Sequence, residues 1–304
     1  MTCPMRHVLA AILALAPACE RWRADPPEVP EHAVDFPRAR ASRVAGVPVV
    51  RIAAPVGTAA VGVALRLGVA GDPPDRPGIT ALTLAALRGH GERPGGLAVT
   101  LGEFGGVPEL VIGREGALLT AEVPAQNAPA AVQALLAALR RPLTDPEELA
   151  TIAAELASAR ARARDDPGAL ALAALRRVAY PAGHPYRATQ LSARTWSIEQ
   201  VREHQARALG PAVLAVVVAG EADDRALARA VEAGLAAWST TVAPPVPPSI
   251  AAAPRHAVHL VARPGLAQAV VALGAATPTE DELAAEVADL LVQSALYDRL
   301  RGEL

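Results

Sequence analysis

The 304-residue sequence contains no lysine, so its 29 basic side chains are all arginine. They are interleaved with 31 acidic residues, and the formal net charge is −2. Nucleic-acid-binding domains concentrate positive charge on one face or along one helix. This sequence shows no such concentration, which argues against a nucleic-acid partner.

Cysteine is almost absent as well, because Cys3 and Cys19 are the only two. Both precede the folded part of the chain, which therefore has neither a disulfide framework nor thiolates for a metal. Gly102, Gly105 and Gly106 do not have the spacing of a phosphate-binding fingerprint. No serine lies in the context of a nucleophile elbow. Dinucleotide-binding enzymes and serine hydrolases are disfavoured accordingly.

The amino terminus has the pattern of an export signal. Arg6 is followed by an apolar run at residues 8–16 and by small residues before Cys19. Such a run is too short to span a membrane, and residues 1–19 therefore predict a signal peptide. Two alternatives remain open: lipidation of Cys19, as in a lipoprotein signal, or simple secretion after cleavage at the Ala-Pro-Ala of residues 16–18. We expect an exported protein of the periplasm or cell envelope, with residues 20–40 as a tether.

The rest of the chain mixes strand-like and helix-like segments. β-Branched runs at 47–52 and 61–69 predict a pair of strands, and Gly78 then opens an apolar helix that stops at Gly89. Further helices are expected at 94–104, 128–140, 145–164, 166–178, 197–209, 223–238 and 281–300, and further strands at 107–112, 117–123, 213–219, 257–261 and 268–273.

A proline-rich stretch at residues 241–254 is the clearest domain boundary. It separates a first domain, residues 41–240, from a short segment at 255–304. The order strand, strand, helix in that segment repeats the order at residues 47–88. We infer that 255–304 is the start of a second domain similar to the first.

Several of these landmarks, taken in order, resemble the insulinase/pitrilysin family of zinc peptidases, which includes the mitochondrial processing peptidase group. They are the strand pair, the turn Asp75-Arg76-Pro77-Gly78, His184-Pro185-Tyr186, the 213–220 strand with its helix ending at Trp238, and Gly265-Leu266-Ala267-Gln268. The likeness runs from about residue 47 to 304. It implies an α+β fold in which helices pack on one face of a mostly antiparallel sheet, with one complete domain and part of a second.

The reaction centre of that family is a His-x-x-Glu-His motif, in which both histidines bind zinc and the glutamate activates water. By the resemblance, Ala81, Leu84 and Ala85 occupy the three motif positions. None of these side chains coordinates a metal or accepts a proton. Glu155 matches the third zinc ligand, but one carboxylate without two imidazoles does not hold catalytic zinc. The resemblance thus implies a non-catalytic homologue without a metal of its own.

The family also uses an arginine and a tyrosine of the second domain to hold the substrate backbone. Arg301 matches the arginine, and the tyrosine would fall beyond Leu304. In some bacterial members the zinc motif and this pair lie on different subunits. The resemblance therefore implies a heterodimer in which this chain helps to hold a peptide for a zinc-bearing homologous subunit.

Two other hypotheses stay open. The chain is alternatively an envelope lipoprotein that uses the same shell for binding or scaffolding, with no peptidase partner. A third hypothesis, an active hydrolase with relocated ligands, requires His90, His184 or His204 to converge on Glu155. His256 and His259 are not a metal pair on a strand, since a spacing of three places them on opposite faces.

Overall fold

The computed structural model describes residues 37–73, 75–89, 96–141, 143, 145–187, 196–209, 212–236, 259–265, 269–274 and 282–302. The predicted signal peptide with Cys19, the proline-rich boundary at 241–254, His90 and Trp238 lie outside these residues. The predictions made for them therefore stay predictions.

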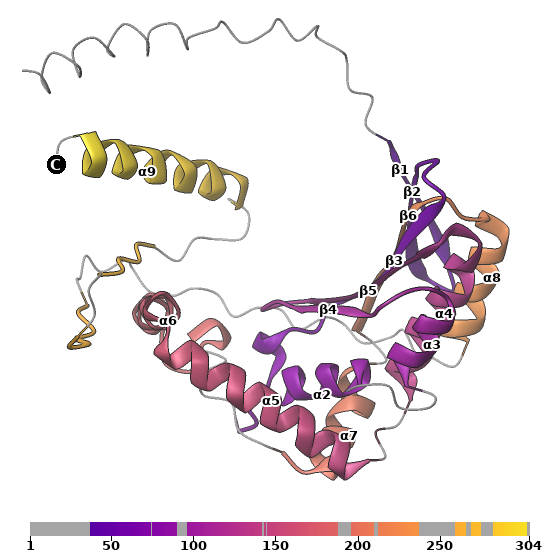
Figure 1. The fold of residues 1–304 in the computed structure, drawn as a ribbon, viewed down its shortest axis with the longest axis horizontal. Helices are drawn as coiled ribbons and strands as arrows, with labels where there is room; N and C mark the ends of the chain where they lie inside the picture. The colour runs from indigo at the N-terminus through magenta and orange to yellow at the C-terminus, as the bar shows by residue number, and fades with distance from the viewer. Residues whose placement is uncertain are drawn as a thin grey trace, which may run out of the picture. The chain divides into compact units, whose positions relative to one another are not determined.

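One six-stranded sheet organises the described residues, in the order β1-β2-β6-β3-β5-β4. The only parallel neighbours are β2 and β6, and every other pair is antiparallel. The predicted α+β class with a mostly antiparallel sheet is confirmed (Figure 1). The strands are β1 (Ala39–Val44), β2 (Val47–Ala53), β3 (Thr58–Leu65), β4 (Glu109–Ile112), β5 (Ala117–Pro124) and β6 (Val213–Gly220).

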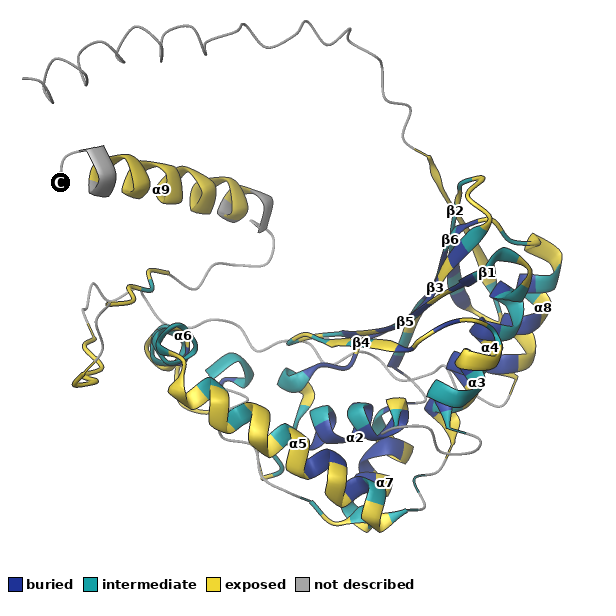
Figure 2. Cartoon of the chain, viewed as in Figure 1, coloured by how far each residue is buried: buried dark blue, intermediate teal, exposed yellow. Residues whose placement is uncertain are grey.

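Among the described residues, helices cover one face of this sheet and leave the other face exposed. Along β5, Ala117, Leu119, Ala121 and Val123 are buried, whereas the residues between them are exposed or half-buried. That alternation is the expected pattern for a strand with a single covered face. The buried side chains join α2 (Ile79–Arg88), α3 (Leu97–Glu103), α4 (Ala128–Arg140) and α8 (Asp224–Leu235) in one core (Figures 1 and 2).

Within this layer, α4 and α8 approach each other closely at Gly234. A Cβ atom at Gly234 would lie 2.5 Å from Cδ1 of Leu136 on α4. Any larger residue at this position would require Leu136 to shift, so glycine suits the close packing of the two helices here.

A second group of helices packs on the far side of α2. It consists of α5 (Pro146–Asp165) and α7 (Ile198–Ala208), and its small core contains Ile79, Leu82, Ala86, Leu149, Ile152, Ala153 and Val201. Both helix starts are capped as their sequences predict. The Asp145 carboxylate accepts from backbone N–H groups of α5, and Ser197 forms a reciprocal capping box with Gln200. The other elements are η1 (Val69–Gly71), η2 (Ala125–Asn127), α6 (Pro167–Ala179), η3 (Pro185–Arg187) and α9 (Glu282–Gly302).

The predicted pairing of the first two apolar strands is wrong. Strand β6 lies between β2 and β3 and bonds to both, in parallel to β2 and antiparallel to β3. The continuous apolar sequence of β6 suits a central position with neighbours on both sides. The sequence does not predict strand β1, because half of its residues are polar and it has no β-branched run. It includes residues 39–40, which we had assigned to the tether.

The two strands expected after residue 255 are wrong in their described parts. Residues 259–261 and 269–273 have no strand structure, although Val270, Val271 and Leu273 are apolar and exposed. Strand propensity forms a strand only when a neighbouring strand supplies hydrogen bonds and side-chain contacts. The helix expected at 281–300 is present as α9.

Candidate functional site

The three positions that the resemblance assigns to the zinc motif lie on α2. Leu84 is buried in the core beneath the sheet, and Ala81 and Ala85 are half-buried. Their side chains are hydrocarbon, so α2 offers zinc neither a ligand nor a general base. These residues do not fit a catalytic zinc ion, and no hydrolytic step can be derived for this helix.

Glu155, the remnant ligand position, lies on α5. This helix packs on α2 through Leu149, Ile152 and Ala153. Glu155 itself is exposed. Among the described residues, no group of three or more His, Cys, Asp or Glu side chains is placed to hold a metal ion.

The histidines of the relocated-ligand hypothesis lie in separate environments. His204 is on α7 and faces the start of α2, whereas His184 lies in the loop between α6 and α7. Neither forms a metal-binding group with Glu155 within the described chain. His90 lies outside it. The described part of the molecule thus gives no support to an active hydrolase built from these residues.

Sequence reasoning missed a buried polar network at the amino-terminal end of α2. Asp72 accepts hydrogen bonds from the backbone N–H groups of Gly78, at 2.5 Å, and Thr80, at 2.9 Å. Gly78 itself has φ +86°, a backbone conformation that favours glycine. A residue with a capping side chain would be strained at that position. Asp72 therefore caps α2 from six residues upstream. A carboxylate six residues before a helix-opening glycine was the available signal.

Thr80 connects this cap to α7. Its Oγ1 atom lies 3.0 Å from Nε2 of His204, whose side chain is 1% exposed. Burial, followed by the charges of Arg207 and Arg76, lowers the pKa of His204 to about 4, so the imidazole is neutral at pH 7. Nδ1 of this ring has no hydrogen-bond partner within the described chain. Burial also raises the pKa of Asp72, against the opposing effect of its hydrogen bonds.

The turn before α2 is tied to α7 from outside as well. Arg76 forms an ion pair with Glu203 at 2.7 Å, and the indole N–H of Trp196 donates to the carbonyl of Pro77 at 3.3 Å. The Pro-Gly turn that carries part of the family resemblance is therefore held in place by interactions that do not involve a metal.

A second polar cluster surrounds the His-Pro-Tyr segment. The His184 ring stacks on Tyr180, with centroids 4.8 Å apart, and meets Tyr186 edge to face. Arg114, in the turn between β4 and β5, donates to the carbonyl of Tyr186 at 2.9 Å and lies over its ring. Burial lowers the pKa of this guanidinium, and the charge of Arg176 lowers it further. The cluster fastens the tip of the β4–β5 hairpin to the loop.

Strand β4 is an edge of the sheet, and α2 packs against it. Gly113 donates to the carbonyl of Gly116 at 2.8 Å, which fixes the alternation of hydrogen bonds along the hairpin. By that alternation Val111 and Glu109 bond to β5, while the backbone groups of Leu110 and Ile112 point to the free edge. In the described chain no further strand pairs there.

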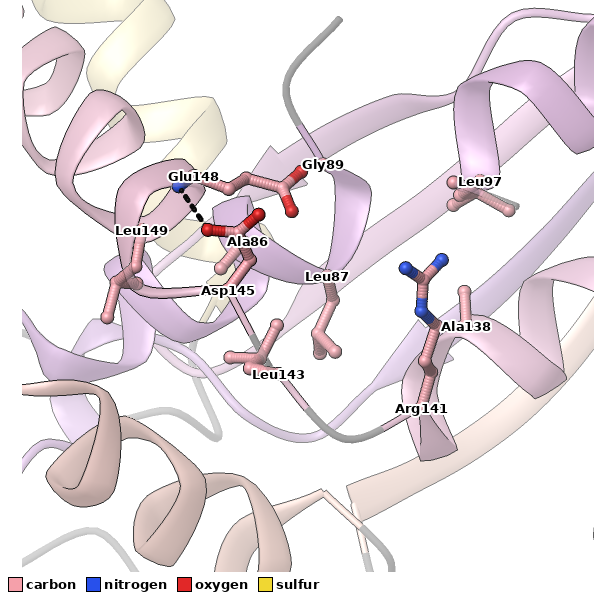
Figure 3. A pocket seen from close by; sticks show the side chains of 11 residues that line it. Ala86, Leu87, Gly89, Leu97, Ala138, Arg141, Leu143, Asp145, Glu148 and Leu149 are labelled. Atoms are coloured by element: carbon pink, nitrogen blue, oxygen red, sulfur yellow. Dashed lines mark hydrogen bonds between the residues drawn. The ribbon is translucent and has the colours of Figure 1, made fainter. Parts of the chain in front are cut away.

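The pocket in Figure 3 lies at the other end of α2 and is small, about 120 Å³. Asp145 there accepts from the backbone N–H of Glu148, as the cap of α5, and Arg141 projects into the space between apolar side chains. Sites for drug-sized ligands typically measure ~300–1,000 Å³. This pocket is therefore too small for a peptide.

Arg301, the expected substrate contact, lies on α9, but its side chain is not among those described. None of the helices in the described ranges is long and apolar enough to cross a membrane.

No protein-family model matches this sequence, and no curated protein matches it either. Its fold, however, is similar to several solved structures. A peptidase M16 inactive domain from Pseudomonas fluorescens matches with a TM-score of 0.61 at 18% sequence identity, over 70% of this chain and 54% of that one. A protease from Helicobacter pylori matches with a TM-score of 0.60 at 16% identity, over 70% and 54%.

Pitrilysin also matches, with a TM-score of 0.56 at 19% identity, over 67% of this chain and 23% of its own. The matched region spans about half the length of the first two structures. At these identities the likeness shows the fold alone. The chain has the M16-like fold that the resemblance implied, with an inactive domain among its structural neighbours.

Proposed function

We propose that this chain is a non-catalytic insulinase/pitrilysin-like homologue that holds an extended peptide for a zinc-bearing homologous subunit. The observation that carries this proposal is the composition of α2. Ala81, Leu84 and Ala85 have hydrocarbon side chains at the positions that the resemblance assigns to the zinc motif. The helix is nevertheless fixed in place, and it packs against β4, an edge strand with which no further strand pairs in the described part of the chain. An M16-like fold with hydrocarbon at these positions supports a non-catalytic role.

The free edge of β4 supports the peptide-holding part of the proposal. A peptide that adds a strand to a sheet gains affinity from main-chain hydrogen bonds. Leu110 and Ile112 present their backbone groups to such a strand. The opposite edge, β1, carries Arg40 and Arg43, and charged side chains are a common means of blunting an edge. The edge beside α2 is thus the better suited of the two.

Zinc and the hydrolytic step belong, in this proposal, to the partner subunit. Likeness to an inactive M16 domain supports a chain that works without catalytic residues of its own. Arg301 on α9 is proposed to contact the peptide backbone. Export, with lipid attachment at Cys19, is proposed from the sequence pattern at the amino terminus and would place the complex at the cell envelope.

The test uses the full reading frame with an affinity tag, purified from its native host without denaturant. The preparation is assayed for cleavage of an unstructured peptide, with and without a zinc chelator. We expect chelator-sensitive cleavage that accompanies the tag and is missing from the recombinant chain alone. Absence of activity from both preparations, with the chain folded, contradicts the partner role and favours a binding or scaffolding lipoprotein.

A second measurement tests the non-catalytic assignment by itself. The recombinant chain is dialysed against metal-free buffer and its zinc content is determined. We expect far less than one zinc per chain. Zinc retained at one per chain would overturn the assignment, whichever subunit the activity follows.

A further inference from the structure

We infer that the β4 edge selects basic peptide segments in which an apolar residue follows or precedes the basic one by two positions. This inference rests on the proposed peptide-holding function and adds the chemical class of the peptide. It is derived from the side chains that a strand added to β4 would meet on the open face of the sheet.

Two residues of β4 point to that open face. Glu109 is exposed, and Val111 is 65% exposed. Across the hairpin Glu109 faces Thr120, and Val111 faces Leu118, itself 39% exposed. The open face of the hairpin thus has an apolar pair beside an acidic position.

A second carboxylate reinforces the acidic position. Glu122 is exposed on β5, two residues beyond Thr120 and therefore on the same face and diagonal to Glu109. Among the described residues neither glutamate forms an ion pair. Both charges are consequently available to a ligand.

Basic groups near the hairpin do not neutralise these charges. Arg114 is engaged with Tyr186, at the tip of the hairpin. Arg66 directly follows β3, whose last pair is Leu65 with Ala117, so it lies at the tip end too. Along β5, Ala117 lies five residues from Glu122, about 17 Å, and three residues from Thr120, the partner of Glu109, about 10 Å. Both distances exceed the screening length of about 8 Å at physiological salt.

The pleat of the sheet determines which residues of a bound peptide lie beside Glu109 and Val111. Side chains of an added strand alternate between the two faces, so the residues beside Glu109 and Val111 are two positions apart. Arginine or lysine complements the first position, and valine, leucine or isoleucine complements the second. The residue between them points toward Leu110 and the helix-covered side.

The alternative occupant is strand β1 of a second copy, which carries Arg43 on the corresponding face. In this structure the Arg43 guanidinium donates to the carbonyl of Gly46 within its own hairpin. The outward neighbour two positions away is Ala41, too small to cover Val111 and Leu118. A peptide from another protein fits the β4 edge better.

The test measures binding by fluorescence anisotropy at physiological ionic strength. The probes are a labelled twelve-residue peptide of three Arg-Ser-Val-Thr repeats and the same peptide with glutamate in place of arginine. The full chain should bind the basic peptide about three- to tenfold more tightly, the effect of two exposed ion pairs. In the Glu109→Lys/Glu122→Lys variant the preference should reverse toward the acidic peptide.

The control is Glu221→Lys/Glu232→Lys, which makes the same change in net charge at exposed positions away from β4. It should keep the preference for the basic peptide. Equal binding of both peptides by the native chain overturns the basic selectivity but leaves peptide holding intact. Failure of the folded chain to bind either peptide overturns the proposed function itself. Sedimentation velocity then measures whether the chain forms oligomers. Oligomers that persist in the presence of the basic peptide would show that a second copy of the chain, and not a peptide, occupies the edge.

Discussion

Thr80 on α2 and His204 on α7 are joined by a 3.0 Å hydrogen bond between the threonine hydroxyl and Nε2 of the imidazole. Asp72 lies on the other side of Thr80 and accepts its backbone N–H. These hydrogen-bonded polar groups fix the start of α2 against α7. The start of α2 is thus fixed by side chains and backbone groups of the chain itself.

The buried His204 should make the protein less stable in acid. Its pKa is lowered to about 4 in the folded state, so between that value and pH 6.5 the unfolded chain binds a proton that the folded chain does not. Stability from this group is complete above pH 6.5 and falls as the pH drops toward 4, by about 3 kcal/mol in all. The raised pKa of Asp72 acts in the opposite sense and offsets part of the loss at the acid end.

Urea unfolding at pH 7.5, 6.0 and 5.0 measures this effect. The His204→Gln variant retains a hydrogen-bonding side chain but does not titrate, so its stability should fall less between pH 6.5 and 5 than that of the native protein. His259→Gln, at an exposed position, should follow the native curve. Equal slopes for the native protein and His204→Gln would show that His204 does not govern the acid response.

Removal of the upstream cap should destabilise α2. Asp72→Ala leaves the N–H groups of Gly78 and Thr80 without their acceptor, and we expect a loss of about 1–2 kcal/mol in the free energy of unfolding. Asp72→Asn keeps one side-chain oxygen and should cost less. The neighbouring Asp75→Ala removes only an exposed contact with Arg76 and should change stability by less than about 0.5 kcal/mol. Similar losses for Asp72→Ala and Asp75→Ala would contradict the capping role.

Arg114 should control the order of the β4–β5 hairpin tip. Arg114→Lys keeps the charge but not the planar group that lies over the Tyr186 ring and donates to its carbonyl. Hydrogen exchange should therefore become faster in residues 113–116 and 184–187. Arg66→Ala, an exposed site at the same end of the sheet, is the matched control and should leave exchange unchanged. Unaltered protection in Arg114→Lys would mean that the loop is held by its aromatic contacts alone.

The sequence predicted the local elements of this fold well, because their signals are themselves local. Ser197 opens α7 and Asp145 opens α5, as their capping patterns indicate, and helix α4 has the bounds that its amphipathic period gives. The strand order was not predictable in the same way. The insertion of β6 between β2 and β3 depends on contacts between residues 148 to 167 positions apart, and no local pattern records them.

In the candidate site, too, local features could be predicted from the sequence and long-range contacts could not. Hydrocarbon at Ala81, Leu84 and Ala85 could be identified from the family resemblance alone. The partnership of Thr80 with His204 could not, because a lone histidine on a helix does not indicate what it faces. Arg114 lies between the strands expected at 107–112 and 117–123, and its contact with Tyr186 joins segments that lie 72 positions apart. Long-range polar contacts of this kind require the structure.

The amino-terminal pattern leads to a prediction about attachment to the membrane. If Cys19 is lipidated, the native chain should incorporate radiolabelled palmitate and sediment with the membrane fraction. Cys19→Ser should lose the label and be recovered in the soluble exported fraction or as an unprocessed precursor. Cys3→Ser is the matched control, because it removes the other cysteine of the leader and should leave the label in place. A soluble native protein that begins just after the Ala-Pro-Ala site, without label, would instead establish simple secretion.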